Sequence, residues 1–598
     1  MRYYCNPMNL EYRYQFMKKQ DTENTYRVFR EAADPSLVLF QEKYYLFPSM
    51  CAGFYTSTDL YQWEFHGFLQ DMPVYDYAPD VRVIGEYLYF CASKSGENCS
   101  FYRTKDPILK PFEEIKGTFP FWDPNLFCDD DGRFYFYWGC SNTEPIYGVE
   151  LDPETMEKIG EPVALISEHE AEYGYERAGD DHQAPKTEEE IRANVEEMFR
   201  KLMGSGQIVG IPEEILKESL YKSMGNKPYI EGAWMNKYQG KYYLQYAAAG
   251  AEYNVYNDGV YVGESPLGPF HLAKNSPYSY KPGGFINGAG HGSTLEDKEG
   301  HYWHTSTMRI SRTYTMERRV GLWKAGFDED GELYCDQRFG DWPIRMDAEP
   351  FEKPDWMLLS YGKPVAVSSG NGAECITDED IRTWWVAGEK EGAWAAVDLQ
   401  ELCDVRGIQV NFADNLLEME KPQELYINVL AHESRGIDCK KQYTRWRLEG
   451  SEDGENYFLI EDKWDAMTDY AHDYISIAEG VQVRFLRLTV RELPYQAVPC
   501  ISGIRVFGKG NGDIPEKASD IQVERSTDLD MEVSWKADGA VGHNVLWGYA
   551  PDKLYHSYMV YGKDRIKIGA LVKGQPLYVR VDSFNGNGLR EGDPISVR

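Results

Sequence analysis

The sequence lacks several features that define large classes of protein. No run approaches the roughly 18 apolar residues of a transmembrane helix, and residues 1–7 contain no apolar segment typical of a signal peptide. The 11 cysteines form no CxxC pair. We therefore expect reduced thiols, a cytoplasmic location and no contact with a membrane.

Positive charge is scarce. Lys and Arg number 63 against 97 Asp and Glu, which gives a formal net charge of −34. Because such a chain does not attract phosphate backbones or anionic lipid, nucleic acid is not expected as a partner, and a neutral substrate such as a plain sugar is favoured. Aromatic residues are abundant, at 14% of the chain. They favour β-strands, and exposed rings suit the C–H faces of sugars, but most are expected to fill β-cores.

A turn followed by a short aromatic strand recurs along the first half of the chain. The five copies begin at Gln41, Gly85, Asp131, Gly240 and Glu299. A strand-rich unit of roughly 45 residues, repeated about five times, is typical of a β-propeller. We therefore predict an all-β chain in which residues 1–350 form a five-bladed β-propeller.

Residues 168–230 interrupt the repeat with a helical pattern. Thr187 and Glu190 form a capping box, apolar residues follow at helical spacing, and a second helix is expected near Pro212. We favour structural padding as the role of this insertion, with a lid over the mouth of the propeller as the alternative.

The pattern changes after about residue 350, where two further β-sandwich domains are predicted. Residues 355–510 resemble a discoidin domain of the coagulation-factor C type, and residues 514–598 resemble a fibronectin type III domain in which Trp535 is a core residue. A Gly-rich linker, residues 508–512, separates the two. These domains are expected to tether a polymer, to form a homo-oligomer interface or to brace the propeller, and bracing is favoured.

Three acidic residues are placed where chemistry is expected. Glycoside hydrolysis usually needs two carboxyl groups that flank the scissile bond. In a propeller they must project from the innermost strands, at the start of each repeat. Asp34, Asp123 and Glu231 precede the first, third and fourth copies. Each alone is more simply a turn former or a cap, but three at equivalent positions favour a shared function.

These motifs resemble those of glycoside hydrolase family 43, whose members are five-bladed propellers. The resemblance covers roughly residues 30–340, through Asp34-Pro35-Ser36, Asp123-Pro124-Asn125 and Glu231-Gly232. It implies that Asp34 is the general base, that Glu231 is the general acid, and that Asp123 tunes and orients. It also implies inversion at the anomeric carbon, with carboxyl groups about 6.5–9.5 Å apart. Asp34 must stay ionised, so we expect it to be hydrogen-bonded and partly solvated.

Five further residues are candidates for binding the substrate: Trp122, Trp234, Asp80, His291 and Arg309. Either Trp can stack on a sugar or pack in the core, and the Arg can bind hydroxyl groups or form a salt bridge. Asp80 is expected to support the site rather than to react. His291 stands where the family often has a His near the substrate or a central calcium ion. Calcium prefers oxygen ligands, so such an ion would be held through water. No cofactor is otherwise required.

The resulting hypothesis is an inverting, exo-acting hydrolase that removes α-L-arabinofuranosyl or β-D-xylosyl residues from plant-derived oligosaccharides. The alternatives are a hydrolase of another glycoside, such as a galactoside, and a non-catalytic propeller that binds glycans. Residues 49–54 lack the Trp that many xylosidases of the family use near the sugar ring, and the helical insertion is not a general family feature. Because of both departures, the sequence does not identify the sugar that is removed.

Overall fold

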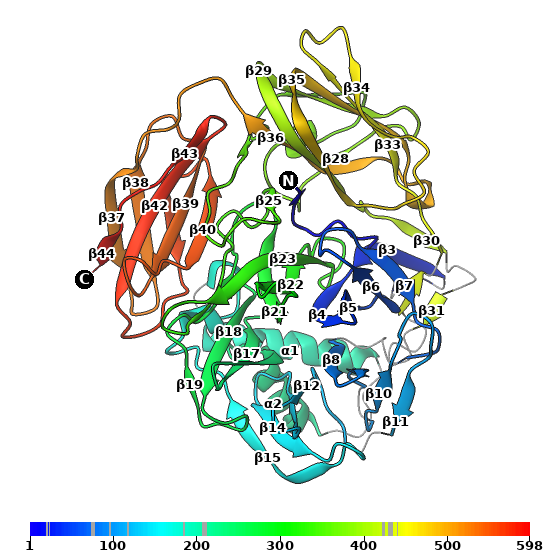
Figure 1. The fold of residues 1–598 in the computed structure, drawn as a ribbon, viewed down its shortest axis with the longest axis vertical. Coiled ribbons are helices and arrows are strands. Elements are labelled where there is room, and N and C mark those ends of the chain that lie inside the picture. Colours follow the sequence, from blue (N-terminus) through cyan, green and yellow to red (C-terminus); the bar gives the residue numbers. More distant parts are fainter. Residues whose placement is uncertain are drawn as a thin grey trace.

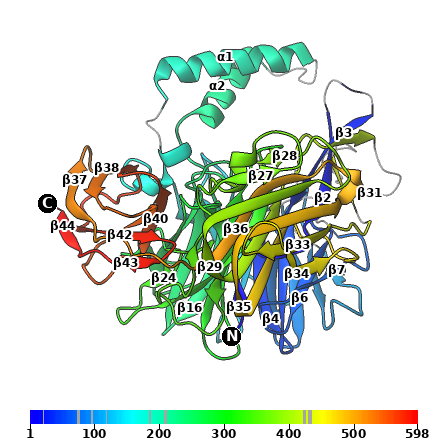
Figure 2. The same ribbon diagram turned by 90° about the horizontal axis from the view of Figure 1, so that it is seen from above.

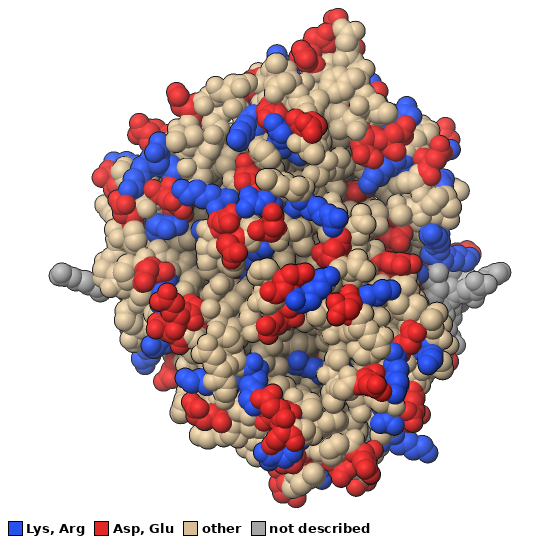
Figure 3. Space-filling model, in the orientation of Figure 1, with Lys and Arg blue, Asp and Glu red and all other residues tan. Residues whose placement is uncertain are grey.

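A computed structural model describes residues 1–19, 22, 24–72, 78–94, 97–116, 119–182, 186–205, 212–420, 425–427, 435–438 and 440–597. The described chain is almost entirely β-structure, as predicted, apart from two α-helices and four short 3-10 turns. None of its helices is long and apolar enough to cross a membrane. Acidic and basic side chains are interspersed over the face shown in Figure 3.

Five antiparallel sheets of consecutive strands occupy residues 33–335 (Figure 1). In chain order they are β4 (Ala33–Phe40), β5 (Lys43–Ser49), β6 (Gly53–Ser57) and β7 (Glu64–Gly67); β8 (Asp80–Ile84), β9 (Tyr87–Cys91), β10 (Phe101–Thr104) and β11 (Glu113–Ile115); β12 (Asn125–Cys128), β13 (Phe134–Trp138), β14 (Ile146–Leu151) and β15 (Lys158–Ile166); β16 (Ile230–Tyr238), β17 (Lys241–Ala248), β18 (Asn257–Gly263), β19 (Phe270–Leu272) and the short β20 (Ser279–Tyr280); and β21 (Asn287–Glu296), β22 (Tyr302–Arg309), β23 (Arg318–Phe327) and β24 (Leu333–Cys335). The aromatic strand of each repeat is the second strand of its sheet.

The first strands of the five sheets contact one another in a closed ring, β4 to β8, β12, β16, β21 and back to β4. Polar side chains link neighbouring strands of this ring by accepting backbone N–H groups. The accepting pairs are Ser36 with Val81 (3.1 Å), Asp80 with Leu126 (2.8 Å), Asn125 with Met235 (2.9 Å) and Ser293 with Leu37 (3.0 Å). The ring is consistent with the predicted propeller, because the innermost strands of propeller blades surround a central axis.

The insertion contains α1 (Glu188–Ser205) and α2 (Glu213–Met224), which pack on each other and project from the strands (Figure 2). The predicted capping box is confirmed, since Thr187 Oγ1 accepts from Glu190 N and Glu190 Oε2 accepts from Thr187 N. Before the helices, two 3-10 turns, Gly174–Glu176 and Asp180–His182, run beside the C-terminal unit, and Arg177 pairs with Asp530 at 2.6 Å. The segment before the helices therefore contacts the C-terminal unit, and the role of the two helices, padding or lid, stays a prediction.

The first strands of the chain do not join the five sheets. β2 (Arg13–Lys18) and β3 (Thr25–Glu31) form a sheet with β30 (Glu418–Glu420), β31 (Leu425–Ile427) and β32 (Arg435–Asp438). The short β1 (Tyr3–Tyr4) pairs with β25 (Ile344–Arg345). The boundary predicted near residue 350 is thus crossed by strand pairing, which a repeat pattern confined to residues 33–335 does not reveal.

The rest of the chain forms two further β-units. The first holds one large sheet, of β26 (Met357–Leu358), β27 (Val365–Val367), β28 (Trp385–Val386), β29 (Trp394–Phe412), β33 (Arg445–Ser451), β34 (Phe458–Lys463), β35 (His472–Glu492) and β36 (Cys500–Lys509), with short turns at Ala373–Ile376 and Pro494–Gln496. The second holds two sheets, one of β37 (Ser519–Arg525), β38 (Met531–Lys536) and β41 (Arg565–Ile568), the other of β39 (Gly542–Gly548), β40 (His556–Tyr561), β42 (Leu577–Asn585), β43 (Gly588–Arg590) and β44 (Ile595–Val597). Trp535 is 4% exposed, so its predicted core position is confirmed.

Candidate active site

The five sheets share an unusual backbone conformation where their first strands begin. Asp34, Ala78, Asp123, Gly232 and His291 all have a positive φ, between 46° and 63°. In β4, β16 and β21 a register shift lies next to this residue. A left-handed non-glycine residue is strained, and a bulge re-aims the side chains around it. Because the conformation recurs at equivalent positions, we infer that these turns aim the functional side chains.

The turns surround a cavity of about 220 Å³. It is lined by Asp34, Trp122, Asp123, Cys140, Tyr229, Glu231, Gly250, Ala251, Glu252, His291, Met316 and Arg318. The structure therefore brings together the three carboxylates chosen from the sequence, with Trp122 and His291 beside them. The indole of Trp122 is partly exposed and free to cover a sugar face.

Asp34 is held as a carboxylate. Its Oδ1 accepts from Arg318 Nη1 at 3.0 Å and from the Thr307 hydroxyl at 3.2 Å, and its Oδ2 accepts from Ser49 at 2.8 Å. Burial opposes ionisation, but Arg318, His291 and the two hydroxyl donors outweigh it, so the pKa of Asp34 lies below its usual value. The side chain is only 3% exposed. These partners, and not the partial solvation expected, keep it charged.

Glu231 and Asp123 form the other side of the site. Cys140 Sγ donates to Glu231 Oε2 at 3.1 Å, and the Tyr256 hydroxyl donates to Oε1. Burial, with the negative charges of Glu231 and Asp34, raises the pKa of Asp123 to about 8 against the opposing charge of His291. Asp123 therefore holds its proton near neutral pH. A general acid needs such a proton.

His291 lies between the two sides. Its Nδ1 is 3.6 Å from Asp34 Oδ1 and 3.8 Å from Asp123 Oδ2, and its backbone N–H donates to Asp258 at 2.6 Å. Burial disfavours the imidazolium, but the surrounding carboxylates outweigh this and raise the pKa of His291. His291 therefore bridges the two sides of the site, and the water-mediated calcium ion considered from the sequence stays a prediction.

Trp234 and Asp80, two of the predicted substrate-binding residues, lie outside the cavity. Trp234 is 4% exposed in an apolar cluster, with the Arg82 guanidinium 3.7 Å from its ring. Its ring packs in the core, and its Nε1 donates to the backbone carbonyl of Thr294 at 3.2 Å. Asp80 is 3% exposed and binds the backbone N–H of Leu126. Asp80 thus supports the ring of first strands, as expected, and neither side chain contacts the cavity.

Arg309 also lies behind the wall of the cavity. Its Nη1 donates to Asp180 at 2.5 Å and to the backbone carbonyl of Glu252 at 2.8 Å, while its Nε donates to Asn287 at 3.1 Å. The side chain is 5% exposed. The geometry therefore supports a salt bridge as the role of Arg309, and not contact with sugar hydroxyl groups. Through it Arg309 fixes the loop that carries Glu252.

Sequence reasoning missed three residues that touch the carboxylates: Arg318, Cys140 and Tyr256. Arg318 and its neighbour Arg319 open the otherwise apolar start of β23, and both are almost completely buried. Two charged residues at the head of an apolar strand were a usable signal, since buried charges are normally paired. Cys140 and Tyr256 stand in connections between strands, where no pattern singles them out.

The site as a whole is that of an acid–base hydrolase. Asp34 is held ionised, the pKa of Asp123 is raised, and both line one small cavity together with Glu231 and an aromatic wall. Residues 28–185 and 200–333 match the model of glycosyl hydrolases family 43. This part of the chain belongs to that family, and the protein is a glycosidase.

Curated relatives match part of the chain. A protein of Humicola insolens named xylosidase/arabinosidase 43A is 26% identical over 345 residues, which cover 51% of this chain and 96% of the relative. A xylosidase/arabinosidase of Bacteroides ovatus is 23% identical over 275 residues, covering 40% and 75% respectively. Among solved structures, a thermostable family-43 glycoside hydrolase is 20% identical and covers 58% of this chain and 100% of its own, with a TM-score of 0.39.

Proposed function

We propose that the protein is an inverting glycoside hydrolase that removes terminal α-L-arabinofuranosyl or β-D-xylosyl residues from plant-derived oligosaccharides. One observation carries the proposal: Arg318 pairs with Asp34 at 3.0 Å in the same cavity that Asp123 and Glu231 line. The printed names of the relatives, xylosidase and arabinosidase, support the choice of sugars.

In the proposed mechanism Asp34 is the general base and Glu231 the general acid. Water attacks the anomeric carbon while Asp34 takes its proton, and Glu231 gives its proton to the glycosidic oxygen as that bond breaks. Asp123 and His291 stand beside the two reacting carboxyl groups and orient the site. The products leave Asp34 protonated and Glu231 ionised, and exchange with solvent restores both. Inversion requires the predicted separation of about 6.5–9.5 Å, which admits the water.

The size of the cavity supports exo action. At about 220 Å³ it is smaller than the roughly 300–1,000 Å³ pockets that hold drug-sized ligands. A single terminal sugar is therefore the substrate portion proposed to enter it, with Trp122 against its face. The leaving oligosaccharide extends toward Tyr229, which is 42% exposed at the wall of the cavity.

We also propose the finer architecture expected from the sequence. The closed ring of first strands supports five propeller blades. The large sheet with Trp385 and Trp446 buried in its core supports a discoidin-like unit at 355–510. The two sheets around Trp535 support a fibronectin type III-like unit at 514–598.

The test is hydrolysis of p-nitrophenyl α-L-arabinofuranoside, p-nitrophenyl β-D-xyloside, a panel of other glycosides, xylobiose and an arabino-oligosaccharide. Asp34→Asn should lose about 10²–10⁴-fold in kcat on every substrate cleaved. Glu231→Gln should lose far less on the nitrophenyl glycosides than on the natural disaccharide, because nitrophenolate leaves without a proton. Asp130→Asn, at a side chain 85% exposed, is the matched control and should retain full activity.

Two results would contradict parts of the proposal. Release of the retained anomer, observed by proton NMR of the first product, would exclude inversion. If the wild-type protein hydrolyses no glycoside of the panel, the second candidate, a non-catalytic glycan-binding propeller, is favoured. The presence of both Asp34 and Glu231 in one cavity argues against that candidate.

A further inference from the structure

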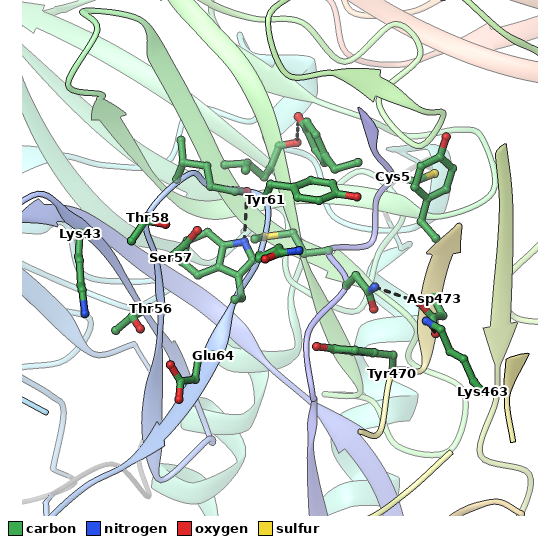
Figure 4. A pocket seen from close by; sticks show the side chains of 18 residues that line it. Cys5, Lys43, Thr56, Ser57, Thr58, Tyr61, Glu64, Lys463, Tyr470 and Asp473 are labelled. Atoms are coloured by element: carbon green, nitrogen blue, oxygen red, sulfur yellow. Dashed lines mark hydrogen bonds and ion pairs between the residues drawn. The ribbon is translucent and has the colours of Figure 1, made fainter. Parts of the chain in front are cut away.

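A second and larger cavity shares no lining residue with the catalytic cavity. Its volume is about 600 Å³. One wall comes from β5 to β7 of the first sheet, the floor from the N-terminal segment at residues 4–9, and the other wall from residues 463–474 of the first C-terminal unit. Figure 4 shows Lys43, Thr56 and Glu64 on one side, and Tyr470, Asp473 and Lys463 on the other.

Aromatic rings and short polar side chains share this lining. Tyr61 and Trp63 from the first sheet, and Tyr470 from the opposite wall, are partly exposed. Thr56, Ser57, Thr58, Asn9 and Gln62 supply hydroxyl and amide groups between them. Ring faces that cover C–H surfaces, with polar groups that meet hydroxyls, are the combination that holds a sugar.

The charges of the lining balance. Lys43 and Lys463 are matched by Glu64 and Asp473, and the last of these pairs with Lys463. The chain as a whole carries a formal charge of −34. A locally balanced surface on so acidic a protein gives no attraction for a phosphate or a basic peptide. It suits a neutral ligand.

Two buried polar groups of the lining lack partners. Tyr474 is 8% exposed, and its hydroxyl has no hydrogen-bond partner within the part of the chain that the structure describes. The same holds for the amide oxygen of Asn9, whose nitrogen donates to Asp473 at 3.2 Å. Both atoms are shielded from the cavity as well as from bulk solvent, so a ligand would contact the exposed aromatic and polar side chains of the lining instead.

We propose that this cleft is a non-catalytic binding site for a neutral oligosaccharide chain, separate from the catalytic cavity. Such a role accounts for the cleft, lined with aromatic residues, between the first C-terminal unit and the first sheet. The site would hold a polysaccharide on the enzyme while terminal residues are removed elsewhere. The choice of xylose- and arabinose-based probes below rests on the proposed function. The class of ligand, a neutral oligosaccharide, is argued from the cleft alone.

Affinity electrophoresis in gels that contain arabinoxylan, arabinan, galactan or glucomannan tests the proposal. The Glu231→Gln protein serves as background, so that no hydrolysis occurs. We expect retardation by at least one polysaccharide, and about a tenfold weaker affinity when Tyr470→Ala or Trp63→Ala is added, since buried aromatic contacts dominate such sites. Phe458→Ala, an aromatic 41% exposed on β34 outside the cleft, is the matched control and should bind normally. Thermal unfolding checks that each variant is folded.

The outcomes separate this proposal from that for the catalytic site. In the active background, Tyr470→Ala and Trp63→Ala should leave kcat/KM for the nitrophenyl glycosides unchanged and lower activity on polysaccharide. If the protein binds polysaccharide but hydrolyses none of the glycosides, the result would support the binding cleft and contradict the proposed activity. Retardation abolished by Trp122→Ala but unaffected by both cleft variants would assign binding to the catalytic cavity and overturn the proposal, as would no retardation by any of the four polysaccharides.

Discussion

Replacing Arg318 tests whether its charge sets the ionisation of the base. Arg318 donates to Asp34 at 3.0 Å and to Glu31 at 2.9 Å, and its side chain is 2% exposed. Arg318→Met removes the charge and keeps much of the volume, while Arg318→Lys keeps the charge. Glu31 retains Arg435 as a partner in both variants, so the buried network is not left wholly unbalanced.

The expected shift follows from Coulomb's law. At about 4 Å between charge centres and an effective dielectric constant of about 20, one pair contributes about 4 kcal/mol, which corresponds to about three pKa units. Burial already pushes the pKa of Asp34 upward, so without Arg318 nothing but His291 and two hydroxyl groups opposes it. We expect the pKa of Asp34 to rise by about one to three units in Arg318→Met.

The assay is the pH dependence of kcat/KM. A general base works only when deprotonated, so a higher pKa of Asp34 moves the acidic limb of the profile to higher pH. Arg318→Met should show this displacement, and Arg318→Lys should show little of it. Circular dichroism and thermal unfolding establish that both proteins are folded. An acidic limb that stays in place in folded Arg318→Met would refute the assignment of Asp34 as the base held by Arg318.

Two further predictions concern Gly232 and Glu176. In Gly232→Ala the new Cβ would lie 2.7 Å from the His291 ring, so kcat/KM should fall at least about tenfold; Gly240→Ala, at φ +80° in open space, is the control for backbone strain and should remain active. Burial raises the pKa of Glu176 to about 8, so the folded state binds a proton that the unfolded state releases above about pH 4.5. Its contribution to stability is present below that pH and is lost as pH rises through about 8. Glu176→Gln should flatten this dependence, by on the order of 4 kcal/mol between pH 5 and 9 in the free energy of unfolding measured by urea denaturation; an unchanged slope would contradict it.

The repeat made the fold of the first half predictable. Each aromatic segment became a second strand, because alternating aromatic residues between turns determine hairpins locally. The pairing of β2 and β3 with β30 and β32 was not predictable in this way. It joins residues some 400 positions apart, and neither partner carries a repeat or a turn signal that names the other.

The carboxylates of the site were predictable for a related reason. Asp34 and Asp123 occupy equivalent places in the repeat, and Glu231 lies one residue before the equivalent place in its sheet, which Gly232 holds. Trp234 shows the limit of that register: it lies three residues after Glu231, and its ring packs in an apolar cluster instead of lining the cavity. Because successive side chains of a strand point to opposite faces, nearness in sequence to a catalytic residue does not place a side chain in the site.

Buried charges, not only strand pairing, connect the five sheets to the first C-terminal unit. Arg30 of β3 is 2% exposed at its side chain and pairs with Asp414 at 2.6 Å and Asp469 at 3.0 Å. Its neighbour Glu31 pairs with Arg435 as well as with Arg318. Breaking a buried pair by removing one partner costs about 3–5 kcal/mol, an appreciable share of the roughly 5–15 kcal/mol that stabilises a domain.

A fragment of residues 1–350 should therefore fail to fold or to act. It would leave Arg30 with no acidic partner from Asp414 or Asp469, and it would strip β2 and β3 of the strands on either side. The damage reaches the catalytic cavity through Glu31, because Glu31 accepts a hydrogen bond from Arg318, and Arg318 also donates to Asp34. We expect the fragment to be insoluble, and co-expression of residues 351–598 as a separate chain to restore both solubility and hydrolysis of the nitrophenyl glycoside. A soluble fragment as active as the whole chain would show that the C-terminal units do not brace the propeller, and would leave glycan binding as their function.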